Sequence, residues 1–96
     1  MITELALLDI NPGSEAAFED AWNEVEHLVI SAGGYISHEL LRGIENPSRY
    51  TLIIRWETLE DHIQGFRGSE AYQEFRPSLQ PFYAETHMEH FGNRGQ

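Results

Sequence analysis

Residues 56–82 read WETLEDHIQGFRGSEAYQEFRPSLQPF. A strand ends at Trp56, and Thr58 can cap a helix directly afterwards, with Asp61 as the partner in a capping box. A glycine then ends this helix and Ser69 caps the next one. This segment therefore brings four functional groups close together in the sequence: the indole of Trp56, the imidazole of His62, the phenol of Tyr72 and the guanidinium of Arg76. These groups suit a pocket for an aromatic small molecule, and the segment contains no recognisable metal-binding or phosphate-binding motif.

Apolar patterns on both sides of this segment predict the other elements. Alternation predicts a strand over residues 2–10, and a stripe at helical spacing predicts a capped helix over residues 14–32. Residues 35–43, 49–57 and 83–91 are expected to form three more strands. In the last helical segment, Pro77 should bend or stop the helix, because proline lacks an amide donor.

Each pattern also predicts which side chains face the core. One face of the third strand should be formed by Tyr50, Leu52, Ile54 and Trp56. One face of the second strand should be formed by Ile36, His38 and Leu40. The inner side of the helix after Thr58 should be formed by Leu59, His62, Ile63 and Phe66.

The order strand, helix, strand, strand, helical segment, strand is that of the ferredoxin-like βαββαβ fold, of the α+β class. Residues 1–96 are expected to form a single domain, with a flexible tail over residues 92–96. Helices would cover one face of a four-stranded antiparallel sheet. The other face would carry a large apolar patch, so we expect it to pack against the same face of a second subunit in a homodimer.

Composition narrows the class of function. The chain has sixteen acidic and six basic residues, and its formal charge of -10 argues against nucleic acid or an anionic membrane surface as a partner. The absence of cysteine excludes disulfides, thiolate zinc sites and a cysteine nucleophile. The N-terminal residues do not read as a signal peptide, and no run approaches the roughly 20 apolar residues of a spanning helix. A cytoplasmic location is therefore expected.

Histidines are the first candidates for chemistry, and there are five: His27, His38, His62, His87 and His90. The last two are three apart on a predicted strand and should point to opposite faces. No HExxH or comparable spacing occurs, so no metal site is expected. His62 falls on the sheet-facing side of its helix. It is either a core histidine satisfied by a neighbour, or a general base or hydrogen-bond partner in an apolar pocket.

Two further residues have both a structural and a functional interpretation. Trp56 either packs in the core, with its N–H on a carbonyl, or forms a pocket wall against a planar ligand. Arg76 either makes a surface salt bridge or stabilises a phenolate or enolate oxygen with its permanent charge. No serine nucleophile elbow, GxGxxG loop or P-loop occurs. The expected substrate contacts are Tyr72, Phe66, Leu52 and His38.

The whole chain resembles the antibiotic biosynthesis monooxygenase family of small dimeric α+β barrels. The resemblance is carried by NPG after the first strand, GG before the second, the run RWETLEDHIQGFRGSEAYQEFRPSLQPFYAE and the closing MEHF. It implies oxygenation, without a cofactor, of electron-rich aromatics such as anthrones, hydroquinones or polyketide phenols. The partners implied are a small aromatic substrate and O₂.

The resemblance also implies roles for single residues. The tryptophan after strand three and the later arginine of oxygenase members match Trp56 and Arg76, while a tyrosine falls on His62 and an asparagine on Leu52. His62 would then be the base or proton relay. Haem-degrading relatives use a different triad, and Ala6, Gln64-Gly65 and Arg76 stand at its positions here, so haem breakdown is not expected.

Two other functions stay open at this point. Leu52 in place of asparagine favours a non-catalytic dimer that binds a small molecule in the same cavity. A structural dimer without a usable cavity would instead have the space filled by side chains of Trp22, Phe66 and Phe75.

Overall fold

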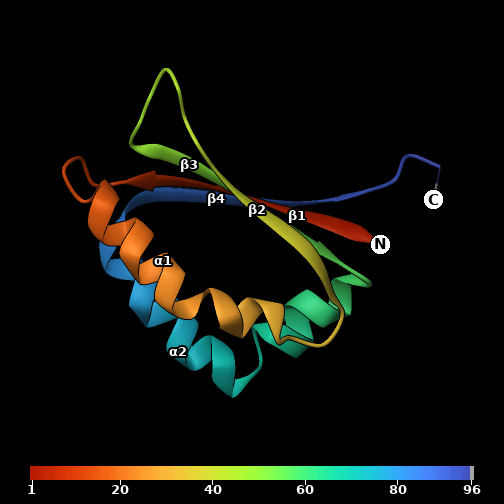
Figure 1. Cartoon of the computed structure of the whole chain (residues 1–96). Helices are drawn as coiled ribbons and strands as arrows, with labels where there is room; N and C mark the ends of the chain where they lie inside the picture. Colours follow the sequence, from red (N-terminus) through yellow and green to blue (C-terminus); the bar gives the residue numbers. More distant parts are fainter. Residues whose placement is uncertain (96) are drawn as a thin grey trace.

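The computed structural model describes residues 1–95 and confirms the predicted ferredoxin-like α+β fold. Four strands form one antiparallel sheet in the order β2-β3-β1-β4. Figure 1 shows both α-helices on the same side of this sheet. The elements in chain order are β1 (Ile2–Ile10), α1 (Glu15–Ile30), β2 (Tyr35–Arg42), β3 (Arg49–Trp56), a π-helix (Asp61–Phe66), α2 (Glu70–Leu79), a 3₁₀ turn (Gln80–Phe82) and β4 (Tyr83–Gly92). No helix within residues 1–95 is long and apolar enough to span a membrane.

The core lies between the sheet and the helices. Strand β3 contributes the four side chains that its alternation predicts, and all of them are buried. Helix α1 buries four residues of its predicted stripe against them. Because fully burying a large apolar side chain stabilises a fold by roughly 1.5–3 kcal/mol, this layer holds the helices on the sheet. The β3 and α1 core residues are Tyr50, Leu52, Ile54, Trp56, Phe18, Trp22, Val25 and Val29.

The capping box predicted after β3 is present. The backbone N–H of Thr58 donates to Asp61 Oδ2, and the backbone N–H of Asp61 donates to Thr58 Oγ1. Ser69 caps α2 as expected, since its Oγ accepts from the Tyr72 backbone N–H. Ser14 occupies the N-cap position of α1, but its side chain makes no capping hydrogen bond.

Two further local predictions are wrong. The turn after the capping box is a π-helix, in which Arg67 N–H donates to the His62 carbonyl five residues back. This wider turn leaves only His62 and Phe66 buried, while Leu59 and Ile63 are exposed.

In β2, Ile36 lies in an irregularity of the pairing between β2 and β3 and is exposed, because the extra residue shifts the alternation there. In α2, the helix passes through Pro77 and continues to Leu79. Pro77 therefore does not stop this helix, and the alternative that it bends the helix stays a prediction.

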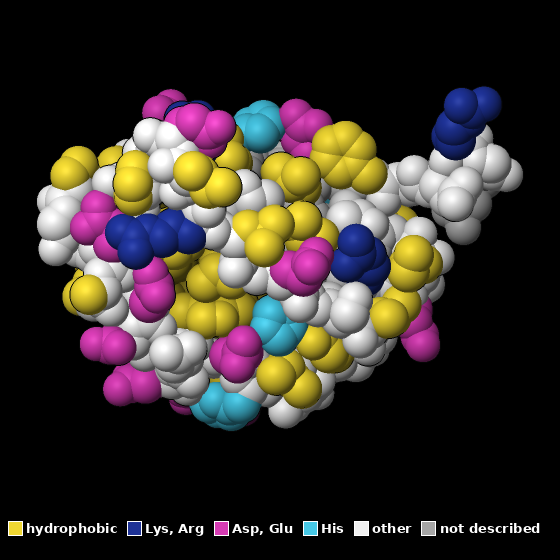
Figure 2. Space-filling model, turned by 45° about the horizontal axis from the view of Figure 1, so that its top comes forward, with side chains coloured by type: hydrophobic (Ala, Val, Ile, Leu, Met, Phe, Trp, Pro, Cys, Tyr) yellow, Lys and Arg dark blue, Asp and Glu magenta, His cyan; other side chains and the backbone are white. Residues whose placement is uncertain are grey.

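The outer face of the sheet is not covered by any helix. Leu5, Leu7 and Ile53 lie side by side on it in neighbouring strands, and all three are partly exposed. Leu41 and Phe91 are 49% and 47% exposed. Figure 2, which brings this side forward, shows hydrophobic side chains mixed with charged ones. The tail prediction stays untested, and Gln96 lies outside the described residues.

Candidate functional site

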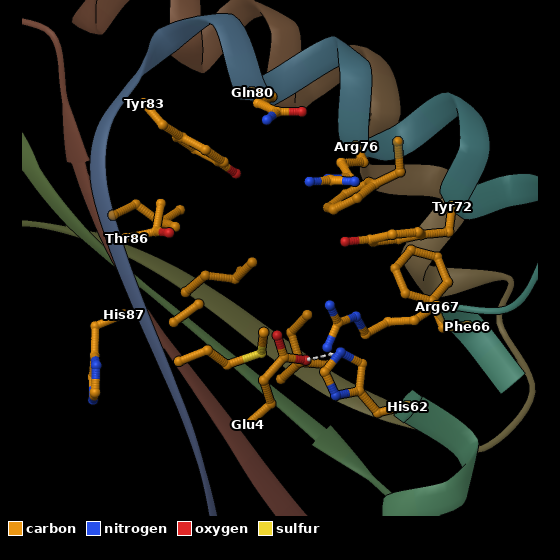
Figure 3. A pocket seen from close by; sticks show the side chains of 16 residues that line it. Glu4, His62, Phe66, Arg67, Tyr72, Arg76, Gln80, Tyr83, Thr86 and His87 are labelled. Atoms are coloured by element: carbon orange, nitrogen blue, oxygen red, sulfur yellow. Dashed lines mark ion pairs between the residues drawn. The ribbon is translucent and has the colours of Figure 1, made fainter. Parts of the chain in front are cut away.

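A cavity of about 260 Å³ opens between the inner face of the sheet and the helical segments. Its floor is apolar and comes from β1, β3 and β4, through Ala6, Leu8, Leu52, Ile54 and Met88. The polar side chains around it come from both layers, and Figure 3 shows most of them converging on one open space, while His87 points away from it. An apolar hollow with few polar groups is the usual form of a small-molecule site.

A chain of hydrogen-bonding groups lies at one end of the cavity. Glu4 stands on the inner face of β1, opposite His90 of β4 in the register. Glu4 Oε1 accepts from Trp56 Nε1–H at 3.0 Å and lies 3.3 Å from His62 Nε2. The other nitrogen of His62, Nδ1, lies 2.8 Å from His90 Nε2. Within residues 1–95, no group of three His, Cys, Asp or Glu side chains is placed to hold a metal ion.

Burial shifts the pKa values of Glu4 and His62, the two central groups of this hydrogen-bond network. Glu4 and His62 are 5% and 3% exposed. Burial lowers the pKa of His62 to about 4, and the nearby His90 and Arg67 add to the shift. Burial raises the pKa of Glu4, while the Trp56 N–H and the Arg67 charge oppose that rise. His62 is therefore neutral at physiological pH.

Two guanidinium groups face the cavity. Arg67 reaches toward Glu4 and His62, and Arg76 points inward from α2 (Figure 3). Neither forms an ion pair with another residue of the described chain, in contrast to Arg42 and Arg49. The guanidinium of Arg67 lies 5.9 Å from the centre of the Tyr72 ring. A second hollow of about 210 Å³ adjoins Arg76 on the α2 side, so this residue lies between two open spaces.

Two tyrosines complete the polar lining. The hydroxyls of Tyr72 and Tyr83 both point into the cavity (Figure 3). The pKa of Tyr83 is raised, first by burial and then by Tyr72 and Glu4, so its hydroxyl keeps its proton and can donate a hydrogen bond. The ring of Tyr72 packs against Phe66 and Phe75, with centroids 5.5 Å and 6.3 Å away.

The structure brings most of the predicted site residues together. His62, Arg76, Tyr72, Phe66 and Leu52 all line the same cavity. The space is therefore open, and the alternative of a cavity filled by the side chains of Trp22, Phe66 and Phe75 does not hold.

Trp56 and His38 do not line it. Trp56 is fully buried behind His62, with the two rings stacked at 5.4 Å and 16°. His38 lies beside the C-terminal half of α1. There its two ring nitrogens bond Tyr35 Oη at 2.6 Å and Glu26 Oε2 at 2.8 Å.

Sequence reasoning missed four residues of this site and its hydrogen-bond chain: Glu4, Arg67, Tyr83 and His90. The signal for Glu4 was present, since it shares the parity of the buried positions of β1. The parity of β4 placed His90 on the face opposite to His87, but its partner could not be predicted without the pairing of β4 with β1. Arg67 follows the buried Phe66 directly, and only the π-turn brings it over the cavity.

Comparison with known proteins gives a consistent result. A model of the antibiotic biosynthesis monooxygenase family matches residues 1–78. The uncharacterised protein YczJ of Bacillus subtilis (strain 168) is 44% identical over 92 residues, covering 95% of this chain and 97% of that protein. A crystal structure of a Bordetella bronchiseptica protein with the same family designation matches with a TM-score of 0.90 at 36% identity, covering 96% and 95% of the two chains.

A more distant match is SnoaB, a cofactor-independent oxygenase from Streptomyces nogalater. Its crystal structure matches with a TM-score of 0.86 at 17% identity, over 97% of this chain and 92% of that one. At this identity the likeness concerns the fold alone.

Proposed function

The chain belongs to the antibiotic biosynthesis monooxygenase family, and from that membership we propose that it oxidises an aromatic phenol, quinol or anthrone with O₂ and without a bound cofactor. The observation that carries this proposal is the meeting of an imidazole, a guanidinium and aromatic walls around one apolar cavity of about 260 Å³. That volume and lining suit a planar aromatic molecule better than a highly polar one.

The chemistry does not require a metal, because the substrate itself supplies the electrons. Loss of one proton from an anthrone leaves a delocalised carbanion, which is electron-rich enough to pass an electron to O₂. Recombination gives a peroxide. Loss of the second proton from that carbon with cleavage of the O–O bond leaves a ketone, and the other oxygen atom departs as water. The two protons removed equal the two that the departing water takes up.

The chain's residues would bind the substrate, stabilise its anion and move protons. Arg76 lies beside the cavity with a permanent charge and no acidic partner in the described chain, so it is placed to stabilise the developing oxyanion. Phe66 and Tyr72 form an aromatic wall. His62 would assist proton transfer through its contact with Glu4, since each of its ring nitrogens already has a partner within the protein.

Oxygen uptake tests the proposal. An oxygen electrode records consumption with a panel of anthrones, hydroquinones and naphthols, and products are identified by mass spectrometry after turnover under ¹⁸O₂. We expect uptake above the uncatalysed rate for at least one compound, with one labelled atom in the product. Uptake equal to the uncatalysed rate across the panel would remove the enzymatic proposal.

A second candidate is a non-catalytic protein that binds an aromatic molecule in the same cavity. The observation in its favour is Leu52, an apolar side chain in the cavity floor where oxygenase members are expected to carry asparagine. Binding seen by quenching of tryptophan fluorescence, without any oxygen consumption by the same compound, would support this candidate.

We also propose that two copies pair through the outer face of the sheet. Support comes from the apolar side chains of Leu5, Leu7 and Ile53, which lie on the face of the sheet opposite to both α-helices (Figure 1). A chain of 96 residues buries a limited core by itself, so a further apolar contact would add to its stability. Sedimentation equilibrium at micromolar concentration should give twice the mass of the chain, and a stable monomer would contradict the pairing.

A further inference from the structure

Removing a proton from the substrate requires a lone pair that faces the cavity. Arginine side chains have none to offer, and tyrosine hydroxyls hold their proton at neutral pH. His87 is among the residues that line the cavity, but its imidazole points away from the open space (Figure 3). The ring instead bonds Glu89 Oε1 at 2.6 Å. These groups are therefore not suited to act as the base.

His62 has the right chemistry but no free nitrogen. When Glu4 is ionised, the Nε2–H of His62 donates to Glu4 Oε1, and Nδ1 accepts a hydrogen bond from His90 Nε2–H. A proton from the substrate could reach His62 only after one of these contacts was broken. The stacked indole of Trp56 behind the ring restricts such a movement. The same two contacts leave no nitrogen available to bind haem iron.

Glu4 has a free oxygen. Oε1 is occupied by Trp56 and His62, whereas Oε2 has no hydrogen-bond partner in residues 1–95 and projects toward the cavity (Figure 3). Within the described chain, every fully buried side-chain oxygen has a hydrogen-bond partner. Because Oε2 has none, it must be accessible to solvent or to a ligand in the cavity. Glu4 is also the only carboxylate among the residues that line the cavity.

We propose that Oε2 of Glu4 is the general base that takes the proton from the bound substrate, an inference that rests on the proposed function. The C–H or O–H bond of the substrate breaks, its electron pair stays on the substrate, and the proton forms a new bond to Oε2. After O₂ has reacted, the same proton passes to the peroxide oxygen. Trp56, His62 and His90 hold the carboxylate in place and act as positioning residues.

The surroundings of Glu4 fit this role. A buried carboxylate is a stronger base than one in water, and burial raises the pKa of Glu4 in the direction that proton abstraction needs. The positive charge of Arg67 lies near enough to act on Glu4, so it opposes the rise and helps to keep the carboxylate ionised before substrate binds. The cation would also attract the anion that deprotonation creates.

Hydrogen exchange without oxygen tests the assignment directly. Anthrone is incubated with the protein in D₂O under anaerobic conditions, and deuterium entering its methylene group is followed by NMR. The wild-type protein should accelerate this exchange, and Glu4→Gln should lower the acceleration by about 100-fold or more. The amide oxygen can still accept from the Trp56 N–H, so binding of anthrone should change by less than about five-fold.

The matched control is Glu89→Gln, which makes the same change on the outer side of β4, and it should exchange at the wild-type rate. At a pH where anthrone ionises in solution, oxygen uptake by Glu4→Gln should recover toward the wild-type rate, as a purely structural role would not allow. Should Glu4→Gln not fold, Glu4→Asp is measured instead, and its shorter side chain should lower the exchange at least ten-fold.

Each outcome is distinct from a failure of the proposed function. Exchange without oxygen uptake would uphold the base and remove the oxygenase reaction. Wild-type exchange in Glu4→Gln or in Glu4→Asp would overturn the assignment of the base and leave the oxygenase proposal standing. No exchange by the wild-type protein would overturn the assignment as well.

Discussion

Acidification should destabilise the fold through His62. Its pKa is lowered from 6.5 to about 4 in the folded protein, so the unfolded chain binds more protons than the folded one between these values. Stability is therefore full above pH 6.5 and falls as the pH decreases. For this shift, linkage gives a loss of about 2 kcal/mol at pH 5 relative to pH 8, and about 3 kcal/mol at pH 4.

The facing groups determine how the effect must be measured. Glu4 on β1, His90 on β4 and Arg67 after the π-helix all lie around the ring. Glu4 acts with the opposite sign, because a raised pKa makes the folded state bind a proton more tightly than the unfolded chain. His90 acts in the same direction as His62, because burial and then the charge of Arg67 lower its pKa. The wild-type curve alone therefore mixes three contributions, and the difference between wild type and His62→Gln reports that of His62.

Urea denaturation at pH 8, 6 and 5 provides the assay, with one protein concentration throughout because association would shift apparent stability. Between pH 8 and 5, the wild-type protein should lose about 2 kcal/mol more than His62→Gln. The exposed His27 supplies the control, since His27→Gln should follow the wild-type curve. Parallel curves for wild type and His62→Gln would refute the burial argument.

Four further outcomes follow from the packing and the site. Phe75→Ala should cost about 3–5 kcal/mol in denaturant unfolding, and a loss below about 1 kcal/mol would mean that the aromatic cluster is not packed as described. Gly34→Ala should cost at least about 2 kcal/mol, because Gly34 has φ +81° and an added Cβ would collide with the Asp61 carboxylate; an unchanged melting temperature would contradict that geometry. Arg76→Gln should lower oxygen uptake about 100-fold while the melting temperature stays within about 2 °C, with Arg76→Lys between the two, and unaltered kinetics would exclude a role for the guanidinium. Leu7→Glu should convert a dimer to a monomer in sedimentation, and an unchanged mass would place the interface elsewhere.

Long regular elements could be predicted from the sequence because their hydrogen-bond pattern fixes the period of the side chains. The alternation of β3 predicted four side chains on one face, and all four are buried. The helical spacing of apolar residues likewise predicted one buried stripe on α1, and Phe18, Trp22, Val25 and Val29 on it are buried. Burial in these elements depends only on local geometry and on having one layer to pack against.

The site could be predicted only in part, because its details depend on pairing between distant strands. His62 was identified from its helix position, and Arg76 from its permanent charge and the family resemblance; both line the cavity. Glu4 was not identified as a site residue, since nothing local indicates that Trp56 and His62 contact its carboxylate. His38 was placed near the pocket by parity, but the position of β2 at the sheet edge keeps it beside Tyr35 instead.

The π-turn explains why the least regular segment carries the site. A hydrogen bond from Arg67 N–H to the His62 carbonyl closes a turn one residue wider than in an α-helix, and such turns are less stable by themselves. Here the contacts of His62 with Glu4, His90 and the Trp56 ring hold the turn in place. The same bond ties the backbone of Arg67 to that of His62. The wider turn thus brings the Arg67 cation and the neutral imidazole of His62 to the cavity where β1 presents the carboxylate of Glu4.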